Sequence, residues 1–234
     1  MGIYDQDESV PEIANLAVDN TEERTPCVLL IDCSGSMGGT PMKQVNAGLK
    51  EFERAIKSDP TTAARVVVCV IGFGFTGSED VRIVEDWTEA DLFNAPTLTA
   101  QGGTPMGKGM DMALDEVEKV KQSLRLNGIT YKRPWVFLMT DGQPTDASWE
   151  KSADRCVAAI KAKQVLVWAL TTAPNSADKL GRFVGPGNQV FNIEGADLSS
   201  MFVWLSSSLS AVSEGGAGES RQIPAPGPMI TIET

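Results

Sequence analysis

Oxygen-bearing side chains directly follow two apolar segments of the sequence. Residues 27–31 are continuously apolar and lead into an Asp-x-Ser-x-Ser pattern, and the largely apolar residues 135–140 lead into an Asp-Gly pair. Short apolar runs of this kind are typical of strands that are buried on both faces of a parallel sheet. In such sheets the ligand site lies beyond the carboxyl ends of the strands, where loops lead into helices. The residues placed at that edge are Asp32, Ser34, Ser36 and Asp141.

A third segment brings a further hydroxyl to the same edge. Thr104 follows two glycines and precedes Pro105, which opens a helix pattern with apolar residues at three- and four-residue steps. Two carboxylates and three hydroxyls are oxygen ligands of mixed charge, which a hard divalent cation such as Mg²⁺ prefers. Because three of the five side chains are neutral, a cation held by them stays electrophilic and keeps a position for a carboxylate from another molecule.

The composition excludes several kinds of active site. The chain has 234 residues and no histidine, so Ser-His-Asp and Cys-His nucleophile pairs and imidazole-bound zinc are impossible. The four cysteines have no paired C-x-x-C spacing and fall far apart or within expected buried elements, so we expect free thiols in the core. These cysteines are Cys27, Cys33, Cys69 and Cys156.

The charge of the chain limits its partners. It has 31 acidic and 20 basic residues and a formal net charge of -11, which would repel a nucleic acid or an anionic membrane surface. No apolar run approaches the roughly 20 residues needed to span a bilayer. The first residues lack the basic start and the apolar core of a secretory signal. We therefore expect a cytoplasmic protein that binds neither nucleic acid nor membrane.

Strands and helices alternate along most of the sequence. The continuously apolar strands indicate a doubly wound α/β domain, with a mostly parallel, Rossmann-like sheet covered by helices on both faces. Residues 81–87 alternate between apolar and polar, which predicts an antiparallel edge strand. The expected strands are 27–31, 64–73, 81–87, 135–140, 165–170 and 189–193, and the main expected helices are 40–56, 104–124, 149–160 and 198–212, with a short helix between the last two strands.

One domain with short tails accounts for the whole chain. We expect this domain over residues 25–213. Residues 1–24 form an acidic segment in which 13–18 is a candidate edge strand, and residues 214–234 form a Gly- and Pro-rich tail.

At the candidate site the chain resembles the von Willebrand factor A (VWA) family. The metal-ion-dependent adhesion site (MIDAS) of that family is written D-x-S-x-S, then Thr, then Asp, on three separate loops. Within the family the chain is most similar to the bacterial tellurium-resistance TerY-like proteins, on residues 102–107, 128–146 and 201–213. The matched MIDAS residues are Asp32, Ser34, Ser36, Thr104 and Asp141.

The resemblance implies both a fold and a function. It implies a Rossmann-like sheet that holds Mg²⁺, Mn²⁺ or Ca²⁺ at its top and binds protein partners without catalysing a reaction. An Asp or Glu of the partner then completes the coordination of the metal. Relatives of the TerY type occur beside a protein kinase and a phosphatase in bacterial stress-response systems, so these two are the expected partners.

Other interpretations of the same residues are weaker. Asp is common at turns, but the joint presence of Asp32, Asp141 and Thr104 favours a site. The glycines of the first turn lack the spacing of a phosphate-binding P-loop. The alternative function is a metal-dependent phosphohydrolase with Asp32 as nucleophile. That enzyme needs a base and nearby cations, for which Lys43 and Lys108 are the available lysines.

Four further features have simpler structural interpretations. Asp146 is expected to cap the helix that follows it rather than support the site. The two cations of residues 131–135 are expected in a solvated turn at the opposite edge of the sheet. Met106 and Met110 are expected in the core. The apolar face of residues 202–213 fits either docking on the sheet or binding a partner.

Overall fold

Six strands form the central sheet. The fold is taken from a computed structural model, which describes residues 16, 19–171, 173, 176–185, 190–192, 198–215, 220–223 and 230–233. The strand order is β3-β2-β1-β4-β5-β6, with β3 antiparallel to β2 and the other neighbours parallel. The strands are β1 Thr25–Asp32, β2 Val66–Phe73, β3 Val81–Glu89, β4 Trp135–Thr140, β5 Leu166–Thr171 and β6 Val190–Asn192.

The central strands form because their residues are buried on both sides. Every residue of β1, β2 and β4 is buried. Successive residues of β1 enter different cores, since Leu29 and Ile31 belong to one cluster, whereas Val28 and Leu30 belong to the other. Strand β3 mixes buried and exposed residues, as an edge strand does. These observations confirm the predicted doubly wound, mostly parallel sheet and its antiparallel edge strand.

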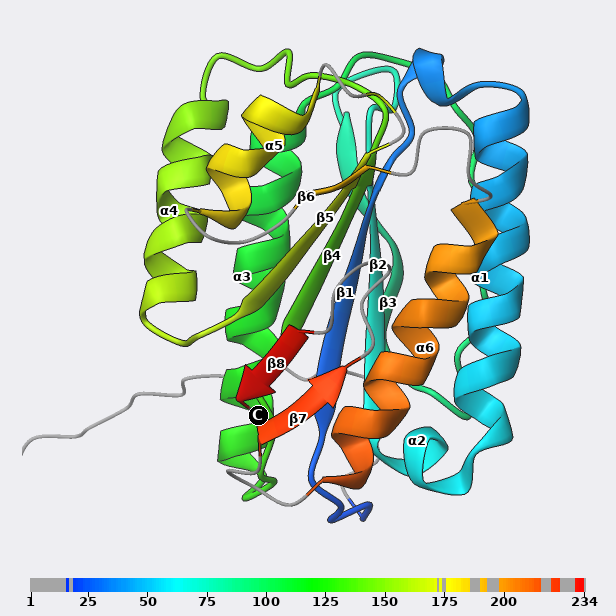
Figure 1. Cartoon of the computed structure of the whole chain (residues 1–234), viewed down its shortest axis with the longest axis vertical. Coiled ribbons are helices and arrows are strands. Elements are labelled where there is room, and N and C mark those ends of the chain that lie inside the picture. Colours follow the sequence, from blue (N-terminus) through cyan, green and yellow to red (C-terminus); the bar gives the residue numbers. More distant parts are fainter. Residues whose placement is uncertain are drawn as a thin grey trace, which may run out of the picture.

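Helices cover both faces of this sheet (Figure 1). Helices α1 and α6 pack together on one face, and α3, α4 and α5 lie on the other. Gly48 of α1 permits close packing, because a Cβ atom there would lie 2.3 Å from the ring of Phe202 in α6. The helices are α1 Thr40–Ser58, α2 Pro60–Arg65, α3 Met106–Leu126, α4 Trp149–Lys161, α5 Ala177–Val184 and α6 Leu198–Glu214.

Several predicted core positions are buried. Met106 and Met110 of α3 are fully buried, and all four cysteines are buried free thiols. Burial raises the pKa of the Cys33 thiol to about 12, so this thiol is protonated and unreactive at neutral pH. Helix α6 packs its apolar residues into the core it shares with α1, which confirms that residues 202–213 dock on the sheet.

Other elements differ from the prediction. Helix α2 and a short 3-10 turn at Gly35–Met37 had no apolar periodicity to reveal them. The tail contains an antiparallel pair of strands, and the first of them contacts α6. These strands are β7 Ser220–Ile223 and β8 Ile230–Glu233. The candidate edge strand at 13–18 lies outside the described residues, apart from Leu16.

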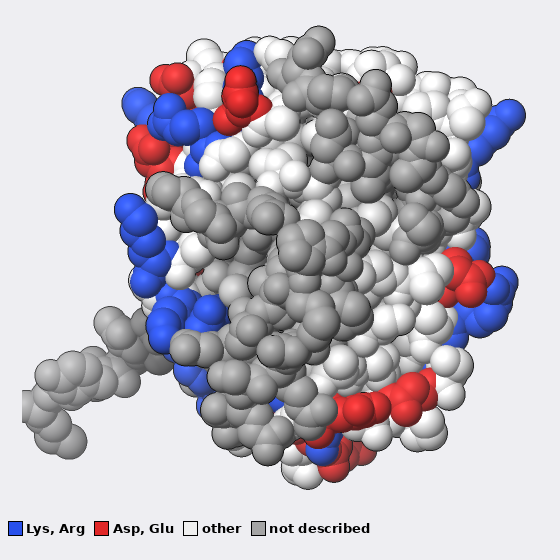
Figure 2. Space-filling model, in the orientation of Figure 1, with Lys and Arg blue, Asp and Glu red and all other residues white. Residues whose placement is uncertain are grey.

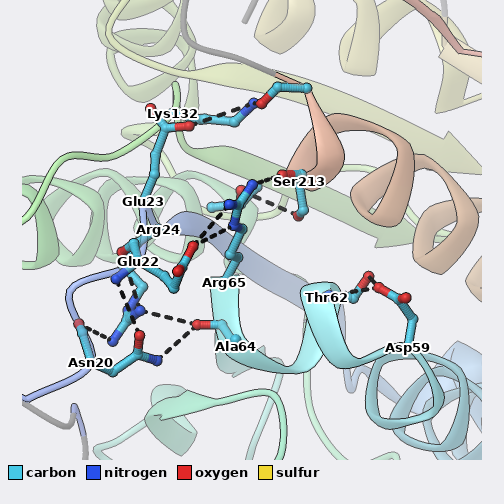
Figure 3. Close-up of polar contacts among 12 residues, drawn as sticks. Asn20, Glu22, Glu23, Arg24, Asp59, Thr62, Ala64, Arg65, Lys132 and Ser213 are labelled. Atoms are coloured by element: carbon cyan, nitrogen blue, oxygen red, sulfur yellow. Dashed lines mark hydrogen bonds and ion pairs between the residues drawn. The ribbon is translucent and has the colours of Figure 1, made fainter.

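A buried arginine anchors the edge of the sheet where the parallel strands begin (Figure 3). Arg24 is fully buried and donates hydrogen bonds to Glu89 at 2.7 Å and to the backbone oxygen of Ala64 at 3.0 Å. Asn20 donates to the same backbone oxygen at 2.9 Å. Arg24 therefore joins the entry to β1 with the ends of α2 and β3.

A buried lysine at the same edge corrects one prediction (Figure 3). Lys132 is 3% exposed and donates to the carbonyl oxygens of Val212 at 2.7 Å and Gly215 at 2.6 Å. The last carbonyls of a helix lack partners within it, and a lysine ammonium supplies three donors. The solvated turn predicted at residues 131–135 is therefore wrong for Lys132, which instead caps the end of α6.

Charged side chains of both signs lie at the margins of the face shown in Figure 2. Ion pairs between neighbouring helices bring opposite charges together, as between Arg182 of α5 and Asp154 of α4 at 3.2 Å. Within the described part of the chain, no helix is both long enough and apolar enough to cross a membrane.

Candidate metal centre

The sheet has a topological switch point between the carboxyl ends of β1 and β4, which is the position of the ligand crevice in doubly wound folds. After β1 the chain enters α1 on one face of the sheet, and after β4 it enters α4 on the opposite face. Loops that diverge in this way leave a ligand site at the carboxyl ends of the two strands. Asp32 is the last residue of β1, and Asp141 directly follows β4, so both carboxylates lie at this crevice.

The Asp32 carboxylate is held rigidly inside the protein. It is fully buried, and its two oxygens accept hydrogen bonds from the Ser34 backbone N–H at 2.7 Å and the Thr140 hydroxyl at 2.5 Å. Burial raises the pKa of Asp32 to about 6; these hydrogen bonds oppose the rise, and the charge of Asp141 adds to it. A buried carboxylate near another carboxylate is a group that gains from a nearby cation.

Hydrogen bonds connect the two serines with the second carboxylate. The hydroxyl oxygens of Ser34 and Ser36 lie 3.1 Å apart, and Ser36 donates to Oδ1 of Asp141 at 2.8 Å. Ser36 lies in the 3-10 turn that separates β1 from α1. The turn directs the Ser36 hydroxyl toward the β4 side of the crevice. The hydrogen bond to Asp141 therefore joins two residues that are 105 positions apart in the sequence.

Thr104 reaches the same crevice from the segment before α3. A Cβ atom at Gly142 would lie 3.2 Å from the Thr104 hydroxyl and 3.6 Å from Oδ2 of Asp32. The Thr104 N–H donates to the Thr145 hydroxyl at 3.0 Å, and the Thr145 N–H donates to the Thr104 carbonyl at 2.9 Å. The structure thus brings all five residues of the candidate site together.

Backbone hydrogen bonds fix the loops around the site. Gln101 donates to the carbonyl of Cys33 at 2.7 Å, and Gly35 donates to the carbonyl of Gly102 at 2.8 Å. Gly102 donates to the carbonyl of Gly74 at 2.6 Å. Gly74 has a φ of 100°, and a Cβ atom there would lie 2.6 Å from the Ser34 nitrogen, so a larger residue would disturb the site.

Three supporting residues were missed or misread in the sequence. Thr140 holds Asp32, and Thr145 holds Thr104. The only sequence signal for Thr140 is a hydroxyl at the end of an apolar strand.

Asp146 accepts hydrogen bonds from the backbone N–H groups of Gly107 at 3.1 Å and Lys108 at 3.2 Å. It therefore caps α3, and the prediction that it caps the following helix is wrong. The loop after β4 runs beside the start of α3, which sequence order does not reveal.

The donor set fits a hard divalent cation. Its five side chains offer carboxylate and hydroxyl oxygens, the ligand types that Mg²⁺ and Mn²⁺ accept. Over the described ranges, no group of three or more Asp, Glu, Cys or His side chains is placed to hold a metal. Any cation at this edge would consequently depend on the three hydroxyls as well as on the two carboxylates.

Fold and site together define a Rossmann-like domain with an oxygen-lined crevice at the carboxyl ends of its strands. The family model of the von Willebrand factor type A domain matches residues 27–202, which cover this sheet, the crevice and most of the helices. The chain belongs to the von Willebrand factor A family. Domains of this family are generally adhesion and interaction modules.

Curated relatives share the domain at low identity. Two von Willebrand factor A domain-containing proteins of Dictyostelium discoideum are each 23% identical to the chain over 137 residues, or 58% of it. The chain spans only 15% and 14% of the length of these two relatives.

Solved structures share the fold. The vWF domain of the type V pili tip protein Mfa5 from Porphyromonas gingivalis aligns with a TM-score of 0.64 at 12% identity, covering 83% of this chain and 98% of that one. The pilus adhesin SpaC from Lactobacillus rhamnosus GG aligns with a TM-score of 0.63 at 17% identity, covering 81% of this chain and 31% of that one. The SpRpn10 VWA domain aligns with a TM-score of 0.55 at 16% identity, covering 78% of this chain and 95% of that one.

Proposed function

We propose that this chain is a divalent-metal-binding protein-interaction module that uses its crevice as a metal-ion-dependent adhesion site. An Asp or Glu of a protein partner completes the coordination of Mg²⁺, or of Mn²⁺ or Ca²⁺. The observation that carries this proposal is the convergence of five oxygen-bearing side chains from three loops. The residues that would hold the metal are Asp32, Ser34, Ser36, Thr104 and Asp141.

The charge of the donor set supports binding of an acidic group rather than catalysis. The two carboxylates would balance the charge of a divalent cation, and the three hydroxyls add none, so a sixth coordination position would stay open to an incoming carboxylate without the repulsion of a site built from carboxylates alone. The chain itself contributes rigidity, because Thr140 and the Ser34 N–H fix the Asp32 carboxylate, and Thr145 fixes the Thr104 backbone. A fixed donor set binds a partner with little loss of conformational entropy.

The resemblance to TerY-like proteins supports a more specific setting. On this basis we propose that the module acts in the cytoplasm, in a bacterial stress-response system of the tellurium-resistance type. A protein kinase and a phosphatase are then the candidate partners, and neither nucleic acid nor membrane is bound. The segments that support this assignment are residues 102–107, 128–146 and 201–213.

The alternative phosphohydrolase gains no specific support from the site. Asp32 is fully buried and both of its oxygens already accept hydrogen bonds, which is a poor arrangement for a nucleophile. Lys108 forms an ion pair with Asp80 at 2.8 Å, and Lys43 is exposed on the first turn of α1. We therefore propose a module that acts without catalysis.

A binding experiment with a matched control tests the proposal. The immobilised chain is exposed to a bacterial lysate with Mg²⁺ or with EDTA, and the candidate kinase and phosphatase are quantified by mass spectrometry. We expect EDTA and Thr104→Ala each to abolish capture, whereas Thr97→Ala, an exposed threonine of the same segment, leaves it intact. Capture that resists both EDTA and Thr104→Ala would contradict the proposed function.

A further inference from the structure

The segment that delivers Thr104 has no regular secondary structure of its own. Residues 93–105, between β3 and α3, contain neither helix nor strand. Part of this segment is nevertheless buried, since Phe93, Ala95 and Leu98 are each at most 6% exposed. Backbone groups in such a segment need partners outside it, because burial removes their access to water. The position of Thr104 therefore depends on contacts made by other elements.

One side chain of α1 satisfies both backbone groups of a residue in this segment. The Asn46 amide nitrogen donates to the carbonyl of Leu98 at 2.9 Å, and the Leu98 N–H donates to the Asn46 amide oxygen at 2.8 Å. This reciprocal pair copies the contact that a neighbouring strand would make. Glu53, two turns further along α1, accepts a hydrogen bond from the N–H of Ala95 at 3.1 Å.

We propose that Asn46 is a positioning residue for the metal centre, which it serves by fixing the segment that carries Thr104. This inference rests on the proposed function. Asn46 stands on the helix that begins directly after the loop of Ser34 and Ser36, so one helix sets both the serine loop and the threonine segment.

The geometry between Leu98 and Thr104 explains how the effect is transmitted. The backbone N–H groups of Gln101 and Gly102 donate hydrogen bonds to the carbonyls of Cys33 and Gly74. These hydrogen bonds require that the segment keep its position beside the two loops. Without Asn46, the buried backbone groups of Leu98 lose both partners, and the segment must shift to regain others. Such a shift pulls on the two hydrogen bonds that hold the Thr104 backbone to Thr145 and so displaces the Thr104 hydroxyl, while the Asp32 carboxylate stays fixed by its own contacts.

The test compares two asparagines that each brace a backbone group. Asn46→Ala is compared with Asn20→Ala, because Asn20 donates to the carbonyl of Ala64 at the opposite edge of the sheet. The affinity for Mg²⁺ is measured by calorimetry, and amide exchange at residues 98–104 is measured in EDTA. We expect Asn46→Ala to raise the Kd for Mg²⁺ about tenfold and to speed exchange in that segment, with Asn20→Ala changing neither.

The outcomes separate this inference from the proposed function. If the unsubstituted chain binds Mg²⁺ and Asn46→Ala keeps its Kd within roughly twofold, Asn46 is not a positioning residue. An equal rise in Kd for Asn20→Ala would also overturn the inference, since the effect would then follow from lost stability. If the unsubstituted chain does not bind Mg²⁺, the proposed function itself fails, whatever the exchange rates show.

Discussion

At the scale of single residues, the burial of Asp32 determines how the site responds to pH. Its carboxylate is fully buried, and burial raises its pKa to about 6, whereas an unfolded chain gives an Asp pKa of about 4. Between these values the folded state holds a proton that the unfolded state releases. The metal-free protein should therefore lose stability as pH rises from about 4 to about 6.

Replacing this carboxylate tests the argument. In EDTA at pH 8, Asp32→Asn should raise the free energy of unfolding by up to about 3 kcal/mol, because the buried charge is gone. At pH 4 the two proteins should be nearly equal in stability. Urea unfolding across this pH range checks the expectation, and the same variant should no longer bind Mg²⁺. Equal stability of the variant and the unsubstituted chain at pH 8 would show that the charge costs nothing.

At the scale of elements, the two helices on one face of the sheet are packed through a glycine. A Cβ atom at Gly48 of α1 would lie 2.3 Å from the Phe202 ring, and that ring cannot move freely because it also contacts the aromatic rings of Phe52 and Phe137. Close packing of this kind leaves no space for an added methyl group.

A pair of glycine substitutions tests this packing. Gly48→Ala should destabilise the protein by about 1–3 kcal/mol through overpacking. Gly181→Ala is the control, since a Cβ atom in that part of α5 would meet nothing within 4 Å. The control should be neutral or stabilising by up to about 1 kcal/mol, because alanine favours helix. Urea unfolding distinguishes the two, and an unchanged stability for Gly48→Ala would contradict the tight contact.

Most elements could be predicted from the sequence because their signals are local. Local patterns indicate which residues face the core. Examples are the apolar run 27–31 and the helical stripe through Val45, Leu49 and Phe52. The irregular segment 93–105 carried no such signal. Its position follows from contacts with Asn46 and Glu53, which lie more than 40 residues away in the sequence.

At the scale of the whole molecule, the candidate site and a polar network occupy opposite edges of the sheet. The site lies where β1 and β4 end. The network, which contains Asn20, Arg24 and Lys132, lies just before β1 and β4 begin (Figure 3). Lys132 belongs to the network, because its ammonium group caps the last carbonyls of α6. The two edges should therefore respond separately to substitution.

Substitution of the buried lysine tests this separation. Lys132→Met should lower the free energy of unfolding by about 1–3 kcal/mol, since it leaves the carbonyls of Val212 and Gly215 without this donor. Lys151→Met, at an exposed position on α4, should change stability little. Thermal unfolding and Mg²⁺ calorimetry are measured on both variants. A loss of Mg²⁺ affinity in Lys132→Met would show that the two edges are coupled.

The same scale explains what the sequence could reveal of the site. Asp32 and Asp141 could be placed together because parallel strands end at one edge of a sheet, and their position after apolar runs marks that edge. The capping of α3 by Asp146 and the burial of Lys132 depend on which loops lie side by side. That information belongs to the assembled fold and has no counterpart in local spacing.

Diffraction from crystals soaked in Mn²⁺, recorded at the manganese absorption edge, tests the central claim most directly. We expect one anomalous peak in the crevice, within bonding distance of oxygens from all three loops, and its loss in Thr104→Ala crystals. A peak elsewhere on the molecule, or none in the crevice, would contradict the claim that Asp32, Ser34, Ser36, Thr104 and Asp141 form a metal centre.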